Sequence, residues 1–340
     1  LIGMPLEIVG AVLVTLLLPV LLTGAALVDL YLWLRERKPW VGVRLVMTLW
    51  SFLVIEVWAM EVLLSVWIAS GGPFGKGSMR RRRGIYWLRP RWARLHFGSL
   101  QRLFGLRVET EGLDQAHPRA LVFIRHASIV DNLVGDTFVA WHNDAGLRYV
   151  IKRELQAIGV IDIGGRWIPT VFLRRVSDNP AAEIAKITRL TEDLGPAEYV
   201  FIYPEGTRAT EAKIKRAKEK VRESSLELGK LADPLVNLLP PRLGGPLALI
   251  AADPSLDLVI CGHVGFDGYE SIGDIWRGRL VGQRIKVRCW RFAAEEIPRD
   301  EAGATKWMYE RWHELDRWVS TEREGLASER SPAPTESTAS

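Results

Sequence analysis

The chain has 340 residues, of which 48% are hydrophobic and 25% charged, and its formal net charge is +5. This composition excludes a disordered protein and supplies enough apolar residues for one large domain or two modest ones. Cys261 and Cys289 form no C-x-x-C pair and cannot define a disulfide framework. We therefore predict neither a zinc site nor a thioredoxin-like motif, and we expect no metal or cofactor.

The first apolar segment contains no charged residue between Ile8 and Val28. A helix of about 20 apolar residues matches a hydrocarbon core of roughly 30 Å, so this segment is predicted to be embedded in a membrane. The chain begins L-I-G-M-P-L-E without a positive charge, which disfavours a signal peptide. The alternative is a buried helix of a soluble protein.

A second apolar segment, residues 45–70, is long enough to cross a membrane but contains Glu56 and Glu61. Carboxylates are costly in hydrocarbon unless they are paired, protonated or turned toward protein or water. Basic residues precede the segment, and the arginine run 80–83 follows it. Because basic residues favour the cytoplasmic side, two arrangements stay open, a re-entrant or interfacial helical hairpin and a two-pass anchor.

The basic and aromatic region around residues 80–97 directly follows the apolar segments. Anionic lipid head groups are the nearer partner for these arginines, each basic residue contributing about 1 kcal/mol at a membrane surface. The chain shows no helix-turn-helix, zinc-finger or RNA-binding signature, so we expect no nucleic acid partner. We expect the rest of the chain on the cytoplasmic face of the inner membrane.

From about residue 120, short β-prone runs alternate with helical stretches. The runs are residues 120–125, 147–152, 199–204 and 256–264. Nearly continuous apolar strands between longer segments predict an α/β fold, a mostly parallel β-sheet flanked by helices. The charged stretch 211–230 is predicted to be a single solvated helix. Chemistry in such sheets lies at the carboxyl ends of the strands.

His126 directly follows the first of these runs, and Asp131 comes five positions later. If the chain turns between them, the histidine can act as a general base and the aspartate can orient its ring. The same stretch gives an S-x-x-D capping box from Ser128 to Asp131, which would fix that turn. The pattern is weak by itself, since it also arises by chance.

The segment F-I-Y-P-E-G-T-R, residues 201–208, ends another run. Gly206 permits a tight or positive-φ turn, Arg208 offers a planar fork for a phosphate, and Thr207 with nearby backbone amides can complete an anion site. The alternative is a strand-to-loop corner with a surface arginine. The other histidines lack such surroundings, and we expect them to be structural or exposed: His96, His117, His142, His263 and His313.

Together these segments resemble the PlsC-type glycerolipid acyltransferases, whose four blocks recur here in order. The blocks are H-A-S-I-V-D from His126, V-F-L-R-R ending at Arg175, F-I-Y-P-E-G-T-R, and the P-P-R-x-G-G element within residues 238–247. Further stretches are similar to the branch that includes lysocardiolipin acyltransferases: residues 150–155, 291–298 and 307–316. The resemblance covers roughly residues 85–320 and implies a glycerolipid acyltransferase-like fold.

One departure from the family pattern precedes the catalytic histidine. The family usually has Asn at this position, and this chain has Arg125. We expect this extra cation to alter head-group choice or to lower the basicity of His126.

The resemblance implies a membrane-bound O-acyltransferase. His126 would be the general base, with Asp131 orienting it. The acceptor phosphate would be held by Glu205, Gly206, Thr207 and Arg208, with added positive charge from Arg175 and Lys152. The acyl donor would be an acyl-CoA or acyl-carrier protein as co-substrate, and the acceptor a lysophospholipid, most simply 1-acyl-glycerol-3-phosphate.

The domain prediction has three parts, a membrane hairpin over 1–75, the α/β acyltransferase domain over 76–324 and a disordered tail over 325–340. Alternatives to the function are a lysophospholipid-remodelling or glycerol-3-phosphate acyltransferase, a CoA-independent transacylase, a non-catalytic protein that binds anionic membrane lipids, and a membrane-tethered nucleic-acid-binding protein.

Overall fold

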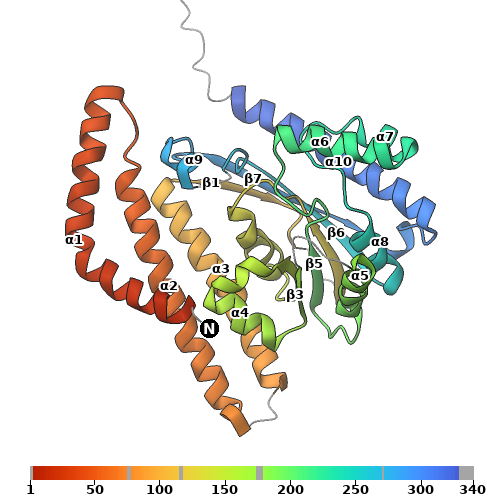
Figure 1. Ribbon diagram of the computed structural model, residues 1–340, viewed down its shortest axis with the longest axis horizontal. Helices are drawn as coiled ribbons and strands as arrows, with labels where there is room; N and C mark the ends of the chain where they lie inside the picture. Colours follow the sequence, from red (N-terminus) through yellow and green to blue (C-terminus); the bar gives the residue numbers. More distant parts are fainter. Residues whose placement is uncertain (1–2, 75–77, 115–117, 174–178, 270–271, 329–340) are drawn as a thin grey trace, which may run out of the picture.

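The computed structural model describes residues 3–74, 78–114, 118–173, 179–269 and 272–328 (Figure 1). Two long apolar helices come first, α1 (Gly3–Glu36) and α2 (Gly42–Ala69). Helix α3 (Ser78–Phe104) follows, and a seven-stranded sheet forms the centre of the remaining chain.

The strand order across the sheet is β1-β7-β6-β2-β5-β3-β4. Strands β6, β2, β5, β3 and β4 run parallel, β7 is antiparallel to β6, and β1 is parallel to β7. The strands are β1 (Arg107–Glu111), β2 (Arg119–Ile124), β3 (Gly146–Lys152), β4 (Thr170–Leu173), β5 (Glu198–Ile202), β6 (Asp257–Val264) and β7 (Arg284–Phe292).

Helices cover both faces of the sheet (Figure 1). The longer ones after α3 are α4 (Gly159–Trp167), α5 (Pro180–Thr188), α6 (Glu211–Ser224), α7 (Leu226–Ala232), α8 (Gly244–Ala252) and α10 (Glu301–Ser328). The short ones are η1 (Gly72–Phe74), η2 (Val130–Leu133), the π-helical η3 (Gly135–Ala140), η4 (Arg153–Ala157), η5 (Arg189–Thr191), α9 (Ile272–Trp276) and η6 (Ala294–Glu296).

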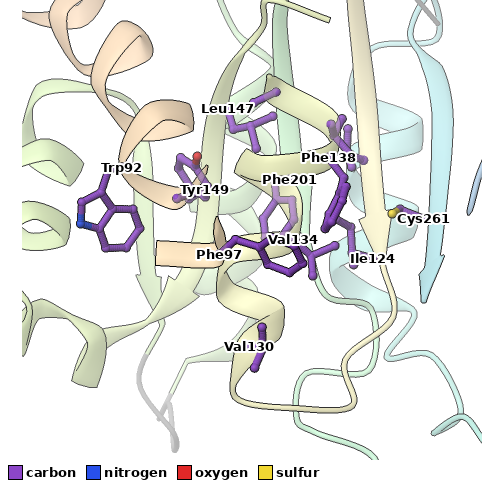
Figure 2. Close-up of a cluster of buried hydrophobic side chains, with 14 of the residues drawn as sticks. Trp92, Phe97, Ile124, Val130, Val134, Phe138, Leu147, Tyr149, Phe201 and Cys261 are labelled. Atoms are coloured by element: carbon purple, nitrogen blue, oxygen red, sulfur yellow. The ribbon is translucent and has the colours of Figure 1, made fainter. Parts of the chain in front are cut away.

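Two apolar clusters sandwich the sheet, because successive side chains of each strand point to opposite faces. Val122 and Ile124 of β2 pack in one cluster with α2, α3 and η3, and Figure 2 shows part of this layer around Phe97 and Phe138. Leu121 and Phe123 pack in the other cluster with helices that include α8 and α10. The predicted α/β fold is confirmed, with a mostly parallel sheet buried on both faces.

All four predicted strands are present, within two residues of their expected ends. Three further strands, β1, β4 and β7, were not predicted. Strand β1 has the sequence R-V-E-T-E, is mostly exposed and has one neighbour in the sheet, while β7 alternates half-buried and buried residues along most of its length. Such strands lack the continuous apolar run that reveals a central strand.

The solvated helix predicted over residues 211–230 is divided into two helices, α6 and α7. The helix is interrupted at Ser225, which has φ −158° and accepts a hydrogen bond from the Leu228 amide at 3.3 Å. Ser225 thus caps α7, and Ala232 of this helix is fully buried. At the other end of the chain, α10 continues to Ser328, so residues 325–328 of the expected tail are helical, and 329–340 lie outside the described residues.

Helices α1 and α2 are each long and apolar enough to cross a membrane. Figure 1 shows that α1 is bent, and Pro19, which has no N–H to donate, lies within it. Asp29 of α1 accepts hydrogen bonds from the amides of Gly42 and Val43, both at 2.8 Å. These bonds satisfy free donors at the start of α2 and fix the two helices as a hairpin.

Glu56 of α2 is completely buried against α3. Its carboxylate accepts a hydrogen bond from Trp92 at 2.9 Å and lies 3.1 Å from Nε2 of His96. Glu61, in contrast, is exposed. The cost of the buried carboxylate is therefore offset by α3, and this face of α2 packs on protein.

Candidate functional site

The predicted site residues meet at the carboxyl edge of the sheet. Strand β5 lies between β2 and β3, so the residues that follow β2 and β5 and the end of β3 are neighbours. This brings His126, the segment 203–208 and Lys152 to one place. Strand β4 ends beside them at Leu173, and Arg175 lies outside the described residues.

His126 and Asp131 form a hydrogen-bonded pair. Nδ1 of His126 lies 3.0 Å from Oδ2 of Asp131, and the aspartate is completely buried. Because an ionised carboxylate only accepts hydrogen bonds, Nδ1 carries the proton and Nε2 is left as the basic atom. The arrangement that the sequence predicted for a general base and its orienting partner is therefore geometrically available.

The turn between the two residues is held by Asp131 itself. Its Oδ2 accepts hydrogen bonds from the backbone amides of Ala127 and Ser128, the latter at 2.7 Å. Its Oδ1 accepts one from the Ser128 hydroxyl at 2.6 Å, and that hydroxyl accepts one from the Val130 amide at 3.1 Å. The Asp131 carboxylate and the Ser128 hydroxyl thus both accept from backbone amides at the start of η2, as the predicted cap requires, although the hydroxyl takes the Val130 amide and not that of Asp131.

Two opposite effects act on the charge of Asp131. Burial by itself would raise the pKa of this carboxyl, but His263 and His126 lower it well below its usual range. Asp131 is therefore an anion throughout the physiological pH range.

Burial lowers the pKa of the His126 imidazole below its ordinary value of 6.5. The charges of Lys152 and Arg208 lower this pKa further, and together these effects outweigh Asp131. His126 is consequently unprotonated at neutral pH, the state that a general base requires. The same result places the two predicted cations close enough to act on the histidine.

Tyr203 completes the surroundings of His126 and was not predicted from the sequence. Its ring stacks on the imidazole with centroids 4.3 Å apart, and its hydroxyl donates to the Asp131 carbonyl oxygen at 2.7 Å. Its position between the apolar run and Pro204 made it look like one more strand residue. The stacking restrains the imidazole plane that Asp131 aligns.

Glu205 has a different role from the one that the sequence predicted. Its side chain is buried, and its two oxygens accept hydrogen bonds from the amides of His126 at 2.6 Å and Leu239 at 3.0 Å. A buried carboxylate occupied in this way does not hold a phosphate. Glu205 instead ties the segment after β5 to the backbone of His126 and to residue 239 of the fourth block.

Burial raises the pKa of Glu205 to about 8, although the two amides and Arg125 lower it. A carboxyl whose pKa is raised on folding stabilises the protein most below its ordinary value of 4.5, and this stability is lost as pH rises to about 8. The free energy of unfolding is expected to fall over this interval by up to about 5 kcal/mol. The Glu205→Gln variant should lack this part of the fall, measured by denaturant unfolding in detergent at several pH values. Glu211→Gln, at an exposed site on α6, should keep the native slope, and equal slopes in all three proteins would contradict the assignment.

The turn after Glu205 depends on Gly206, which has φ +65°. A Cβ atom there would also lie 2.8 Å from Cδ of Arg242. The exposed Arg242 side chain therefore lies against this turn, where the fourth block meets the third. Its amide donates to the Pro204 carbonyl oxygen at 2.8 Å. The sequence placed this arginine in the family's fourth block but gave it no role.

Helix α10 positions the fourth block. Asp316 accepts hydrogen bonds from the amides of residues 236–238, at 2.7 to 3.1 Å, and Trp312 donates to the Leu239 carbonyl oxygen at 3.0 Å. Leu239 in turn donates to Glu205. The late stretch 307–316 is thus connected to His126 through three hydrogen bonds, by way of Leu239 and Glu205.

Arg125 does not point toward a substrate. Its side chain is 1% exposed, pairs with Asp267 and donates to the His263 carbonyl oxygen. The expected effect on head-group choice through a free cation is therefore wrong, since the charge is buried and neutralised. That Arg125 lowers the basicity of His126 stays a prediction.

A cavity of about 510 Å³ opens between α3 and η3. Apolar residues of α2, α3, β1 and the segment of η3 and Trp141 form its walls, and arginines of α3 lie at its rim. The residues are Trp58, Leu95, Phe97, Gly98, Val108, Phe138 and Trp141, with Arg91, Arg94 and Arg102. Phe97 and Phe138 also belong to the layer in Figure 2 that packs on the sheet. The combination suits an amphiphile with a negative head and an apolar body. No group of three or more potential metal ligands occurs in the described part of the chain.

Known proteins similar to this chain agree on one activity. The acyltransferase family model matches residues 107–236. The 1-acyl-sn-glycerol-3-phosphate acyltransferase gamma of Homo sapiens is 26% identical over 217 residues, which cover 63% of this chain and 55% of that protein. An uncharacterized acyltransferase of Schizosaccharomyces pombe is 22% identical over 188 residues, 51% of this chain and 50% of its own length. The chain thus spans about half the length of the curated relatives it matches.

The fold also has a known counterpart. The crystal structure of the 1-acyl-sn-glycerophosphate (LPA) acyltransferase PlsC from Thermotoga maritima aligns with a TM-score of 0.53 at 16% identity, covering 82% of this chain and 96% of that chain. The segment that the family model matches contains His126, Asp131 and the turn after β5. Over residues 107–236 the chain is therefore similar to the acyltransferase family, and its fold resembles that of the PlsC structure.

Proposed function

We propose that the protein transfers a fatty acyl group from an acyl thioester to the free hydroxyl of 1-acyl-glycerol-3-phosphate, which gives phosphatidic acid. The observation that carries this proposal is the hydrogen-bonded pair of His126 and Asp131, with Nδ1 3.0 Å from Oδ2, at the sheet edge where Lys152 and Arg208 also lie. A base next to a cluster of positive charge suits an acceptor that has both a hydroxyl and a phosphate. The name of the human relative favours the same acceptor.

In this reaction, Nε2 of His126 removes the hydroxyl proton while the oxygen attacks the thioester carbonyl. The C–O bond of the new ester forms, the C–S bond breaks, and the proton passes from the imidazolium to the departing thiolate. Asp131 stabilises the imidazolium between these steps. The thioester is already activated, so holding two amphiphiles together supplies much of the rate, since proximity contributes up to about 7–11 kcal/mol.

The apolar hairpin fits a membrane-bound enzyme whose acceptor and product stay in the bilayer. We propose that α1 and α2 hold the site at the depth of the lipid head groups on the cytoplasmic face, with the arginine run 80–83 toward anionic lipids. The three-part domain division and the lysocardiolipin-like branch stay predictions. Labelling of cysteines introduced at residues 37–41 and 72–74 would separate the two arrangements. A two-pass anchor places these two turns on opposite sides of the membrane, whereas the re-entrant hairpin leaves both on the cytoplasmic side.

The direct test is acyl transfer from oleoyl-CoA to lysophosphatidic acid by the purified protein in mixed micelles. Acyl-carrier protein as donor, and glycerol 3-phosphate or other lysophospholipids as acceptors, would distinguish the related acyltransferases, and transfer from a phospholipid donor would reveal a transacylase. Lipid binding without turnover under all these conditions would support a non-catalytic lipid-binding protein. Steep salt-dependent binding of oligonucleotides would support the nucleic acid alternative.

Arg208→Ala is expected to raise the KM for lysophosphatidic acid by about ten- to a hundred-fold, because a charge-assisted hydrogen bond contributes about 1.5–3 kcal/mol. Initial rates at varied acceptor concentration measure this change. Arg242→Ala should raise the same KM by less, since this side chain is exposed. Arg216→Ala, an exposed position on α6, is the matched control. An unchanged KM in Arg208→Ala would remove this residue from the acceptor site.

We propose that the cavity between α3 and η3 receives an acyl chain. A Cβ atom at Gly98 would have no neighbour nearer than Nη1 of Arg102 at 3.9 Å, so a larger side chain can enter the cavity. Gly98→Leu is expected to slow transfer to or from long acyl chains relative to short ones, and Gly98→Ala should have a smaller effect. The readout is the ratio of rates with chains of different lengths, and an unaltered ratio in both variants would exclude the cavity from substrate binding.

A further inference from the structure

Asp131 has a second histidine partner that the general-base pair does not include. His263 lies near the end of β6, next to β2 in the sheet, and is completely buried. Its Nε2 atom is 3.3 Å from Oδ1 of Asp131, the oxygen that does not face His126. The aspartate thus lies between two imidazole rings.

The hydrogen bonds of His263 assign its proton. Nε2 also lies 3.2 Å from the Arg125 carbonyl oxygen, while Nδ1 is buried and has no hydrogen-bond partner among the described residues. A proton on Nδ1 would therefore be a buried donor without an acceptor, which is costly. The hydrogen bonds therefore place a proton on Nε2, and this N–H is shared between the Arg125 carbonyl oxygen and the Asp131 carboxylate.

We propose that His263 is a positioning residue for the acyl transfer, one that holds Oδ1 of Asp131 and withdraws part of its negative charge from His126. This inference rests on the proposed function and extends it beyond the histidine and aspartate of the first block. The hydrogen bond from His263 keeps the carboxylate from pulling a proton permanently onto His126. This adds to the burial that already leaves His126 unprotonated at neutral pH, while the imidazolium is still stabilised during the reaction.

The residues around His263 keep it in place. The Phe266 ring meets the imidazole with centroids 5.8 Å apart. The Arg125 guanidinium donates to the His263 carbonyl oxygen and is paired with Asp267. The Arg125 backbone carbonyl oxygen accepts from Nε2 of His263. This reciprocal contact explains the buried arginine before the catalytic histidine. It fixes the end of β2 to the end of β6.

The charged groups that face the two rings are few. Toward His263 they are Asp131, Arg125 and Asp267. Burial by itself would raise the pKa of Asp267, but Arg125 lowers it below its usual range. The nearby Cys261 thiol has a raised pKa and stays neutral.

Toward His126 the charged groups are Asp131, Lys152 and Arg208, with Glu205 on its backbone. Burial raises the pKa of the stacked Tyr203 far above neutral. Of these groups, only Glu205 also titrates near neutrality, so its Glu205→Gln variant accompanies the experiment.

The test compares His263→Gln with His263→Phe in the full-length protein in mixed micelles. The glutamine amide can place a donor where Nε2 is, whereas phenylalanine keeps the ring shape without a donor. In His263→Phe, the acid limb of kcat/KM for acyl transfer should move up by about half to one pH unit, because losing one hydrogen bond to the carboxylate changes its interaction with His126 by about that much. We also expect kcat to fall about ten-fold as the alignment loosens. His263→Gln should have a kcat and an acid limb close to those of the native protein.

Histidine NMR of labelled protein gives a readout that needs no turnover. The ring resonance of His126, assigned with His126→Ala, should titrate about half to one pH unit higher in His263→Phe than in the native protein. His96→Phe removes another buried histidine that lies against a carboxylate, Glu56, and should leave this titration unchanged. The Glu205→Gln protein should show the same His263-dependent shift.

An unshifted titration of His126 in a folded His263→Phe protein would overturn the proposal, as would a His263→Gln protein that is as impaired as His263→Phe. If the native protein transfers no acyl group but the NMR shift appears, the acyl-transfer proposal fails and the coupling of the two rings stands. If the native protein is active and the shift is absent, only the role of His263 fails.

Discussion

Replacing His126 with alanine is expected to lower kcat for acyl transfer by about 10²–10⁴-fold, the usual contribution of a positioned general base. Asp131 holds the ring through Nδ1 at 3.0 Å, and Tyr203 stacks on its face. These two contacts leave Nε2 as the ring atom for catalysis. The KM for lysophosphatidic acid should change little, because the proposed phosphate site is at Arg208. Steady-state kinetics at saturating oleoyl-CoA measure both.

The pH dependence of the native protein provides a second measurement on this residue. Because the pKa of His126 is lowered from 6.5, the unprotonated base persists below that pH, and the acid limb of kcat/KM should have its midpoint below 6.5. His142→Ala, at an exposed position after η3, is the control and should leave the profile unchanged. A His126→Ala protein with native activity would refute the general-base role.

Asp131→Asn is expected to lower kcat by a comparable factor, about 10²–10⁴-fold, while leaving the fold intact. Oδ2 faces three donors, the His126 ring and the amides of Ala127 and Ser128, so the asparagine oxygen must take this place. Its NH₂ group then replaces Oδ1 and faces the Ser128 hydroxyl, which can reverse its hydrogen bond. The geometry survives but the negative charge that stabilises the imidazolium is gone.

The measurement pairs kcat with the unfolding midpoint in detergent. Asp136→Asn is a suitable comparison, because Asp136 is also buried and paired, with Arg89 at 3.0 Å, but lies outside the site. We expect that variant to lose stability without a comparable loss of kcat relative to the amount of folded protein. An Asp131→Asn protein that unfolds at a much lower temperature and has native kcat per folded molecule would show that Asp131 is structural alone.

Residue patterns that are local in the chain could be predicted well. The strand that precedes His126 and the one that precedes Glu205 are continuous apolar runs, and such runs reveal buried parallel strands. The turn from His126 to Asp131 and the positive-φ turn at Gly206 could also be predicted, because each depends on only a few neighbouring residues. What the sequence suggested for Glu205 was wrong, since a carboxylate in a loop does not reveal whether it faces solvent or the backbone of a residue 79 positions away.

The sequence by itself thus determined the parallel sheet, the apolar hairpin and the first-block pair, because periodicity, length and short spacing depend on neighbouring residues. Tertiary structure alone decided that Arg125 is neutralised by Asp267, that Asp316 of α10 holds the fourth block, and that His263 reaches Asp131. Each of these contacts joins residues that are 78 to 142 positions apart in the chain. Only the pairing of β2 with β6 and the packing of α10 bring such distant groups together, and no local pattern records it.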